Sequence, residues 1–144
     1  MKLDFWQYTH DPLEKVVALI AKRVLGEGAR LVVVSGDADQ RAAISRALWQ
    51  AGPDTFLANG EAGTAGADRQ PILLADTLQA VNGADHVILA DGVFRDCPGF
   101  ARVFLLFPPE AAPAAREAWS AQDGRADIER AYFAQEDGRW VKKR

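Results

Sequence analysis

Arg116 and Trp119 are the residues of this chain whose types and spacing most clearly suggest a binding site. They lie three positions apart in the segment Ala-Ala-Arg-Glu-Ala-Trp, and residues three apart on a helix share one face. A guanidinium forms paired hydrogen bonds with a carboxylate, and an indole packs against an apolar ring. A peptide that ends in an aromatic residue carries both of these groups at its last position. The pair therefore predicts a site for such a peptide.

The apolar pattern of the chain indicates which elements position this pair. Continuous or alternating apolar runs predict strands, and apolar residues spaced by three and four predict helices. The expected strands are 3–8, 31–34, 55–57, 71–74, 86–90, 103–107, 130–134 and 139–142. The expected helices, of which the last carries the pair, are 12–26, 37–49 and 110–122.

Strands that alternate with helices and read as solid apolar runs imply a parallel sheet covered on both faces. We therefore expect the α/β class, as a three-layer α/β/α Rossmann-like domain with a mostly parallel central sheet and C-terminal closing strands. Because no repeat or linker interrupts the pattern, residues 1–144 are expected to form a single domain.

Local signals add detail to this expected fold. Thr9 or Asp11 is expected to cap the first helix. The dipeptide Asp137-Gly138 suits a tight turn between the closing strands. The segment 58–69 is rich in Gly and Ala, which predicts a mobile surface loop.

Composition limits the classes of function. A net charge of −3 argues against a protein that mainly grips DNA or RNA through phosphates. Four basic residues within 138–144 are interpreted as a solvated tail. One cysteine, Cys97, fits a reducing cytoplasm, and with two histidines it makes a zinc site unexpected. We expect neither a signal peptide nor a membrane-spanning segment.

The chemistry that such folds usually carry is not indicated. A dinucleotide site needs a Gly-rich turn after the first strand, but Tyr-Thr-His-Asp-Pro stands there. The second turn, Ser-Gly-Asp-Ala-Asp at 35–39, places carboxylates where phosphates would lie. Cys97, His10 and His86 belong to no recognisable catalytic motif. We expect no catalytic residue, cofactor or metal; a Rossmann-like nucleotide- or cofactor-binding enzyme with an atypical phosphate loop is the alternative.

Seven ordered landmarks, spread over essentially the whole chain, resemble the chi subunit of bacterial DNA polymerase III. They are Phe-Trp-Gln-Tyr at 5–8, Ala-Leu-Trp at 47–49, Asp-Thr-Phe-Leu at 54–57, Asp-Arg-Gln-Pro-Ile-Leu-Leu at 68–74, Asn-Gly-Ala-Asp at 82–85, Val-Phe-Leu-Leu-Phe at 103–107 and Ala-Arg-Glu-Ala-Trp at 115–119. The resemblance implies a non-catalytic accessory protein of the replicase. This family links the clamp loader, through a partner called psi, to the single-stranded DNA-binding protein SSB, so that contact with DNA is indirect.

The resemblance also implies roles for individual residues. Arg116 would bind the terminal carboxylate of the acidic, Phe-ending SSB tail, and Trp119 would form a wall for its ring. Leu105 or Phe107 is expected to form the floor, and Arg125 to meet acidic residues further up the tail.

The psi-facing surface implied by the resemblance consists of Trp49, Phe56 and Leu57. The chain departs from the family's pattern beside the tail site, where Ser120 stands in place of a lysine that some members carry. Glu117 and Asp123 lie nearby and would repel an acidic tail. Either the affinity is weak, or other basic residues compensate.

Overall fold

The computed structural model describes residues 1–52 and 57–144, and its central element is one mostly parallel sheet. The order of the described strands across the sheet is β3-β4-β2-β5-β6-β1-β7-β8. Neighbouring strands are parallel except for β7 and β8, which are antiparallel. In chain order the strands are β1 (Lys2–Gln7), β2 (Leu31–Val34), β3 (Asn59–Glu61), β4 (Ile72–Ala75), β5 (His86–Leu89), β6 (Arg102–Phe107), β7 (Glu129–Glu136) and β8 (Arg139–Lys142).

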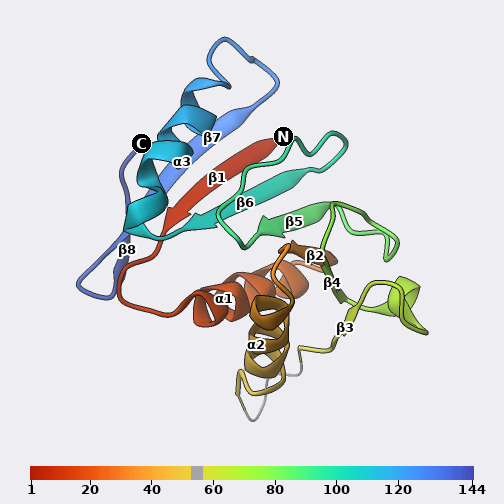
Figure 1. Ribbon diagram of the computed structural model, residues 1–144. Coiled ribbons are helices and arrows are strands. Elements are labelled where there is room, and N and C mark those ends of the chain that lie inside the picture. Colours follow the sequence, from red (N-terminus) through yellow and green to blue (C-terminus); the bar gives the residue numbers. More distant parts are fainter. Residues whose placement is uncertain (53–56) are drawn as a thin grey trace.

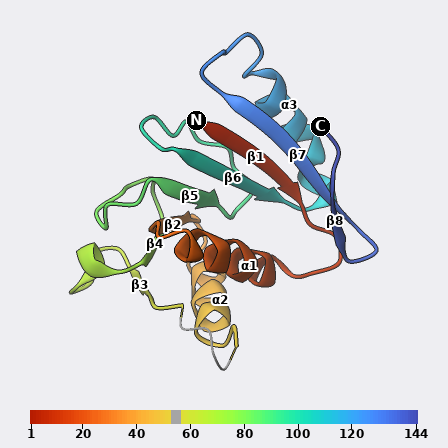
Figure 2. The same cartoon turned by 180° about the vertical axis from the view of Figure 1, so that it is seen from behind.

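Helices cover both faces of this sheet, which confirms the three-layer α/β/α architecture. On one face lie α1 (Leu13–Gly26) and α2 (Ala38–Trp49), and on the other lies α3 (Ala112–Ser120), as Figures 1 and 2 show from opposite sides. Two short 3₁₀ helices are η1 (Ala67–Arg69) and η2 (Pro109–Ala111). Among the described helices, none has the length and apolar character needed to cross a membrane.

The direction of each connection explains which face its helix covers. The connections from β1 to β2 and from β2 to β3 run toward the β3 edge of the sheet, whereas the connection from β6 to β7 runs toward the β8 edge. Crossovers between parallel strands are right-handed, so opposite directions place the helices on opposite faces. Since β1 lies between β6 and β7, α3 has to pass over β1.

Side chains of β1 point alternately to the two faces of the sheet and so contribute to both halves of the core. Phe5 is fully buried on the α3 side, where Leu105 and Ala115 also pack. Its neighbour Trp6 is buried on the α1 side, beside Phe104 of β6. Successive side chains of a strand point to opposite faces, so this one strand contributes a large aromatic residue to each half of the core.

The caps expected for α1 are wrong, because the helix begins after Pro12 with no side-chain cap. The side chain of Gln135 in β7 binds the preceding turn instead: its Oε1 accepts the N–H groups of Thr9, His10 and Asp11 at 3.2, 2.9 and 3.1 Å. Its Nε2 donates to the Asp11 carboxylate, and Thr9 Oγ1 donates to the backbone carbonyl oxygen of Gln135. The donors bound by this buried amide belong to the turn before the helix, whereas the N–H groups of Lys15 and Val16 at the start of α1 donate to the carbonyl oxygen of Pro12.

The loop expected at 58–69 is wrong in part, because this segment contains both β3 and η1, with turns at 62–66 between them. β3 pairs in register with β4, from Asn59 opposite Ile72 to Glu61 opposite Leu74. Gly60 allows a close approach, because a Cβ there would lie 2.9 Å from Nε2 of Gln70. At Gly60 the missing side chain therefore leaves room for the side chain of Gln70. Of the strand expected at 55–57, residues 55 and 56 lie outside the described residues.

The closing hairpin of β7 and β8 confirms the tight turn expected at Asp137-Gly138, where both residues have positive φ (51° and 76°). Beyond β8 the pairing continues: Lys143 N–H donates to the carbonyl oxygen of Tyr132 at 2.7 Å, and Tyr132 N–H donates to that of Arg144 at 3.2 Å. The basic end interpreted as a solvated tail is therefore bonded to β7 through its backbone.

Phe5 should be a main determinant of stability, because its ring is fully buried beneath α3. We expect Phe5→Ala to lower the free energy of unfolding by about 3–5 kcal/mol, through lost burial and a residual cavity. Urea denaturation of the two proteins measures this difference. Leu19→Ala is the control, because Leu19 is 45% exposed and its truncation should change stability by less than about 0.5 kcal/mol. Equal losses for both variants would contradict the assignment.

Candidate peptide-binding site

A hollow of about 380 Å³ lies between α3 and the closing hairpin, and we call it the basic hollow. It contains the two residues that the sequence singled out, together with four others. Three of its lining residues are cationic and none is acidic, so the surface suits an anionic ligand. The lining residues are Arg116, Trp119, Ser120, Tyr132, Lys143 and Arg144.

The aromatic wall of the basic hollow is positioned by β1. The ring of Phe5 lies 5.2 Å from that of Trp119, edge to face, and 6.2 Å from that of Tyr132, in a stacked arrangement. Trp119 and Tyr132 are themselves 6.2 Å apart and nearly perpendicular. Such aromatic contacts hold the rings in defined orientations, and both rings remain partly exposed to the hollow.

The basic wall consists of side chains from α3 and from the hairpin. Within the described part of the chain, the exposed guanidinium of Arg116 makes no ion pair. The guanidinium of Arg144 lies 5.8 Å from the centre of the Trp119 ring. A carboxylate entering the hollow would therefore meet the cations Arg116 and Arg144 in the same hollow as the indole.

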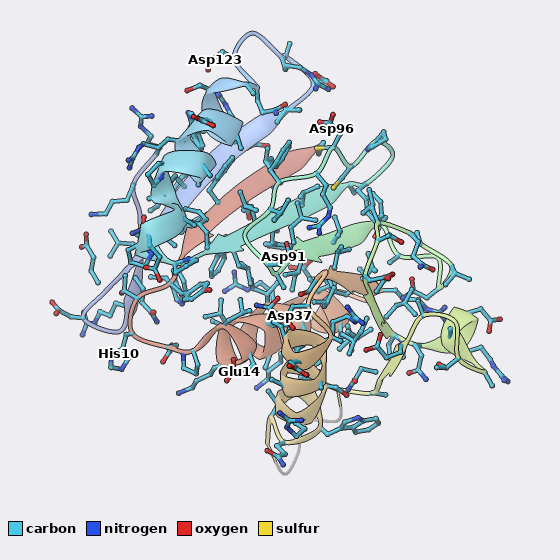
Figure 3. The ribbon with its side chains drawn as sticks, viewed as in Figure 1. His10, Glu14, Asp37, Asp91, Asp96 and Asp123 are labelled. Atoms are coloured by element: carbon cyan, nitrogen blue, oxygen red, sulfur yellow. The ribbon has the colours of Figure 1, made fainter. Side chains whose placement is uncertain are left out.

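The acidic neighbours that raised doubt about this site do not line it. Arg130 binds Asp123 at 2.8 Å, and the same Nη1 donates to the carbonyl oxygen of Trp119 at 2.5 Å. Asp123 lies at the far end of α3 (Figure 3), and its charge is compensated there. Glu117 follows Arg116 directly, and adjacent residues on a helix point about 100° apart. Neither carboxylate therefore opposes an acidic ligand inside the hollow.

Tyr132 is a lining residue that stays uncharged. Burial raises the pKa of its phenol above the usual range, and Arg116 opposes this change. Its hydroxyl donates to Oε1 of Gln7 at 2.6 Å, which fixes the ring against the end of β1. The side chain thus presents a neutral apolar face to the hollow at physiological pH.

Three residues expected at the tail site lie elsewhere. Leu105 and Phe107 are buried in the core and do not line the basic hollow. Phe107 packs against Tyr132 with ring centres 5.8 Å apart. Tyr132, rather than Phe107, therefore lines the hollow. Arg125 lines a separate hollow of about 290 Å³ and forms an ion pair with Asp127 at 2.9 Å.

The residues expected to face psi are not one exposed cluster. Trp49 ends α2 and is 49% exposed. Leu57 is 3% exposed and packs in the core on the α1 side. Phe56 lies outside the described residues. Of the two that the structure describes, Trp49 is the exposed one.

Sequence reasoning missed Tyr132, Lys143 and Arg144 as site residues. Tyr132 was placed in a closing strand, and the other two were assigned to a solvated tail. The available signal was the alternation Arg-Ala-Tyr-Phe-Ala at 130–134, which indicates a strand but not its neighbour. The pairing of β1 with β7, Phe5 opposite Tyr132, is what brings this strand to α3.

The edge where Rossmann-like folds bind phosphates is occupied by the protein's own carboxylates. Asp37 caps α2 by accepting the N–H groups of Asp39 and Gln40. Asp91 follows β5 and accepts Gly36 N–H at 3.0 Å, and Figure 3 shows both carboxylates at this edge. Arg95 also binds Asp91, which holds the pKa of the Asp91 carboxyl below its usual range, so this carboxylate stays charged. A phosphate would be repelled here.

Cys97, considered as a nucleophile, is buried, and its Sγ donates to the carbonyl oxygen of Arg95 at 3.2 Å. Burial raises the pKa of its thiol to about 11, which disfavours the reactive thiolate. His86 binds the adjacent Asp85 at 2.7 Å. Within residues 1–52 and 57–144, no group of three or more His, Cys, Asp or Glu side chains could hold a metal ion.

These features define an α/β protein with a basic, aromatic hollow on its surface, while the usual phosphate edge carries carboxylates. A family model described as DNA polymerase III chi subunit, HolC, matches residues 1–126. The chain belongs to this family, whose members are accessory subunits of DNA polymerase III with a role in replication. No curated protein matches the sequence.

The thiol of Cys97 should be unreactive in the folded protein. At pH 9 a thiol with a pKa of about 11 is almost entirely protonated, whereas the unfolded thiol, with its ordinary value of 9.0, is half ionised. We expect alkylation by iodoacetamide at pH 9, followed by mass spectrometry, to be roughly 50-fold slower in buffer than in urea.

The same shift predicts how stability depends on pH. Above pH 9 the unfolded state releases the thiol proton that the folded state retains, so the free energy of unfolding should fall between pH 9 and 11. Cys97→Ser is the control, because its hydroxyl does not titrate and this part of the decline should disappear. In the alkylation experiment described above, equal rates in buffer and in urea would contradict the burial of the thiol.

Proposed function

We propose that this protein is a non-catalytic accessory subunit that binds the acidic, Phe-ending C-terminal tail of SSB and links it to the clamp-loader complex. It would do so in the cytoplasm during DNA replication, as a single chi-like domain formed by residues 1–144. The observation that carries this proposal is the basic hollow, in which Arg116 and Trp119 line one surface of a chain of the chi family.

The fit of such a tail follows from the lining residues. The fork of donors on Arg116 matches the terminal carboxylate, because it forms two parallel hydrogen bonds. The phenyl ring would pack against Trp119 and Tyr132, which are held by Phe5 from below. Acidic residues that precede the ring would lie near the remaining cations of the hollow. Each part of the ligand then meets a group of complementary chemistry.

A second partner, the psi subunit or an equivalent clamp-loader component, would bind around Trp49. This residue ends α2, which lies on the α1 side of the sheet, whereas the basic hollow lies on the α3 side. Two partners on opposite faces do not compete for the same surface. Such an arrangement suits a linker between two proteins, with DNA reached only through SSB.

Replacing Arg116 tests the peptide site. A peptide that ends in Asp-Asp-Ile-Pro-Phe should bind the wild-type protein with a micromolar Kd, measured by calorimetry or fluorescence anisotropy. Arg116→Ala should weaken binding about tenfold or more, because a charge-assisted pair with the terminal carboxylate is lost. Arg23→Ala is a matched control, since Arg23 is an exposed arginine on α1.

An amidated version of the same peptide sharpens this test. The amidated peptide lacks the terminal charge, so it should bind the wild-type protein weakly. Arg116→Ala should then reduce the affinity for this peptide little further. If Arg116→Ala weakens both peptides by the same factor, Arg116 does not bind the terminal carboxylate. If the unmodified peptide does not bind the wild-type protein, the proposed function fails.

Replacing Trp49 tests the second surface. We expect Trp49→Ala to remove most binding to the psi subunit in a pull-down with purified proteins, because exposed aromatic residues often dominate interface energy. The affinity for the SSB tail peptide should stay within a factor of two, since Trp49 does not line the basic hollow. Leu19→Ala, at an exposed apolar position of α1, is the control. Undiminished capture of psi by Trp49→Ala would exclude this surface.

A further inference from the structure

The closing hairpin contributes two cations to the basic hollow, Lys143 and Arg144, although the family match ends at residue 126. We propose that Arg144, assisted by Lys143, binds the acidic side chains that precede the aromatic end of the ligand peptide. The hairpin would then recognise the acidic part of the peptide, while α3 binds its terminus. This inference rests on the proposed function and assigns specificity for acidic residues to a segment outside the family match.

The backbone of the hairpin holds these cations in place. Lys143 N–H donates to the carbonyl oxygen of Tyr132 at 2.7 Å, and the carbonyl oxygen of Arg144 accepts Tyr132 N–H at 3.2 Å. Both views of the fold place the end of the chain beside α3 (Figures 1 and 2). A cation on an anchored backbone loses less conformational entropy on binding than one on a free tail.

Charge pairing within the protein distinguishes Arg144 from its neighbours. Arg130 is bound to Asp123, and Arg125 is bound to Asp127. Among the residues that the structure describes, Arg144 forms no ion pair with a carboxylate, and its guanidinium instead lies 5.8 Å from the Trp119 ring centre. It therefore keeps its charge available for a ligand, at a position next to the ring that would receive the phenyl group.

Lys143 is a weaker contributor, because its ammonium group binds Glu136. Both of these side chains are about half exposed, at 42% and 50%, so the pair contributes little to stability and can exchange for a pair with the ligand. This places the main role on Arg144 and an assisting role on Lys143.

α3 alone lacks the charge for this task. Its cation in the basic hollow is Arg116, which the terminal carboxylate would occupy, and the next turn presents the uncharged Ser120. A second carboxylate of the same peptide needs a second cation within the same hollow. Arg144 supplies it from the other wall and so compensates for Ser120.

Two peptides and three variants test the proposal. The peptides end in Asp-Asp-Ile-Pro-Phe and Asn-Asn-Ile-Pro-Phe, and they differ only in the charge ahead of the aromatic end. Arg144→Gln keeps most of the side-chain stem over Trp119, Arg144→Lys keeps the charge, and Arg139→Gln removes an arginine of β8 that does not line the basic hollow. Fluorescence anisotropy at several salt concentrations gives each Kd.

We expect Arg144→Gln to weaken the acidic peptide about fivefold and to leave the neutral peptide within twofold. The dependence of the acidic peptide's Kd on salt should also become shallower, because one screened attraction is lost. Arg144→Lys should restore most of the affinity, and Arg139→Gln should change neither peptide's Kd. Thermal unfolding midpoints should be equal for all variants, since these side chains are exposed.

The possible failures are distinguishable. If Arg144→Gln weakens both peptides equally, Arg144 acts by supporting Trp119, and the proposal is overturned while the proposed function stands. The proposal is also overturned, and the proposed function again stands, if Arg144→Gln changes the affinity for neither peptide. An unchanged affinity for both peptides with a loss of binding to single-stranded DNA at low salt would assign Arg144 to nucleic-acid binding instead. If the wild-type protein binds neither peptide, both the proposed function and this inference fail.

Discussion

The insertion of β1 between β6 and β7 is the constraint on which the site depends. β1 pairs in parallel with both neighbours, so the connection from β6 to β7 has to carry α3 across it. That crossing sets Trp119 on the ring of Phe5, and the pairing with β7 stacks Tyr132 on the same ring. The two residues of the aromatic wall, Trp119 and Tyr132, come from elements that follow β1 by more than a hundred residues, and the buried ring of Phe5 aligns them.

The same topology separates the molecule into regions with different chemistry. At the carboxyl edge of the sheet, Asp37 and Asp91 accept the N–H groups to which a phosphate would bind in a nucleotide site. Two cations that form no ion pair with a described residue, Arg116 and Arg144, lie instead in the basic hollow between α3 and the hairpin. The surface around Trp49 lies on the opposite face. This separation supports the proposed role, in which two partners bind on different faces of the sheet.

Much of the fold was predictable because its signals are local. The three helices and the strands of the sheet core were predicted within a few residues, and the tight turn at Asp137-Gly138 was confirmed. The errors arose where a distant partner replaced a local one. Gln135 binds the turn in which Thr9 or Asp11 was expected to cap the next helix, and pairing with β4 makes a strand of the part of the expected loop around Gly60. No pattern within a short window contains these partners.

The sequence by itself determined the fold class, the shared helical face of Arg116 and Trp119, and the resemblance to the family to which the chain belongs. These depend on spacing of three and four residues and on ordered landmarks, which are properties of the chain alone. Only the tertiary structure decided that Tyr132 and Arg144 complete the hollow and that Arg125 lies outside it. The physical reason is that strand order and hairpin pairing depend on burial and backbone hydrogen bonding between residues far apart in the sequence. Local periodicity does not encode which strands become neighbours.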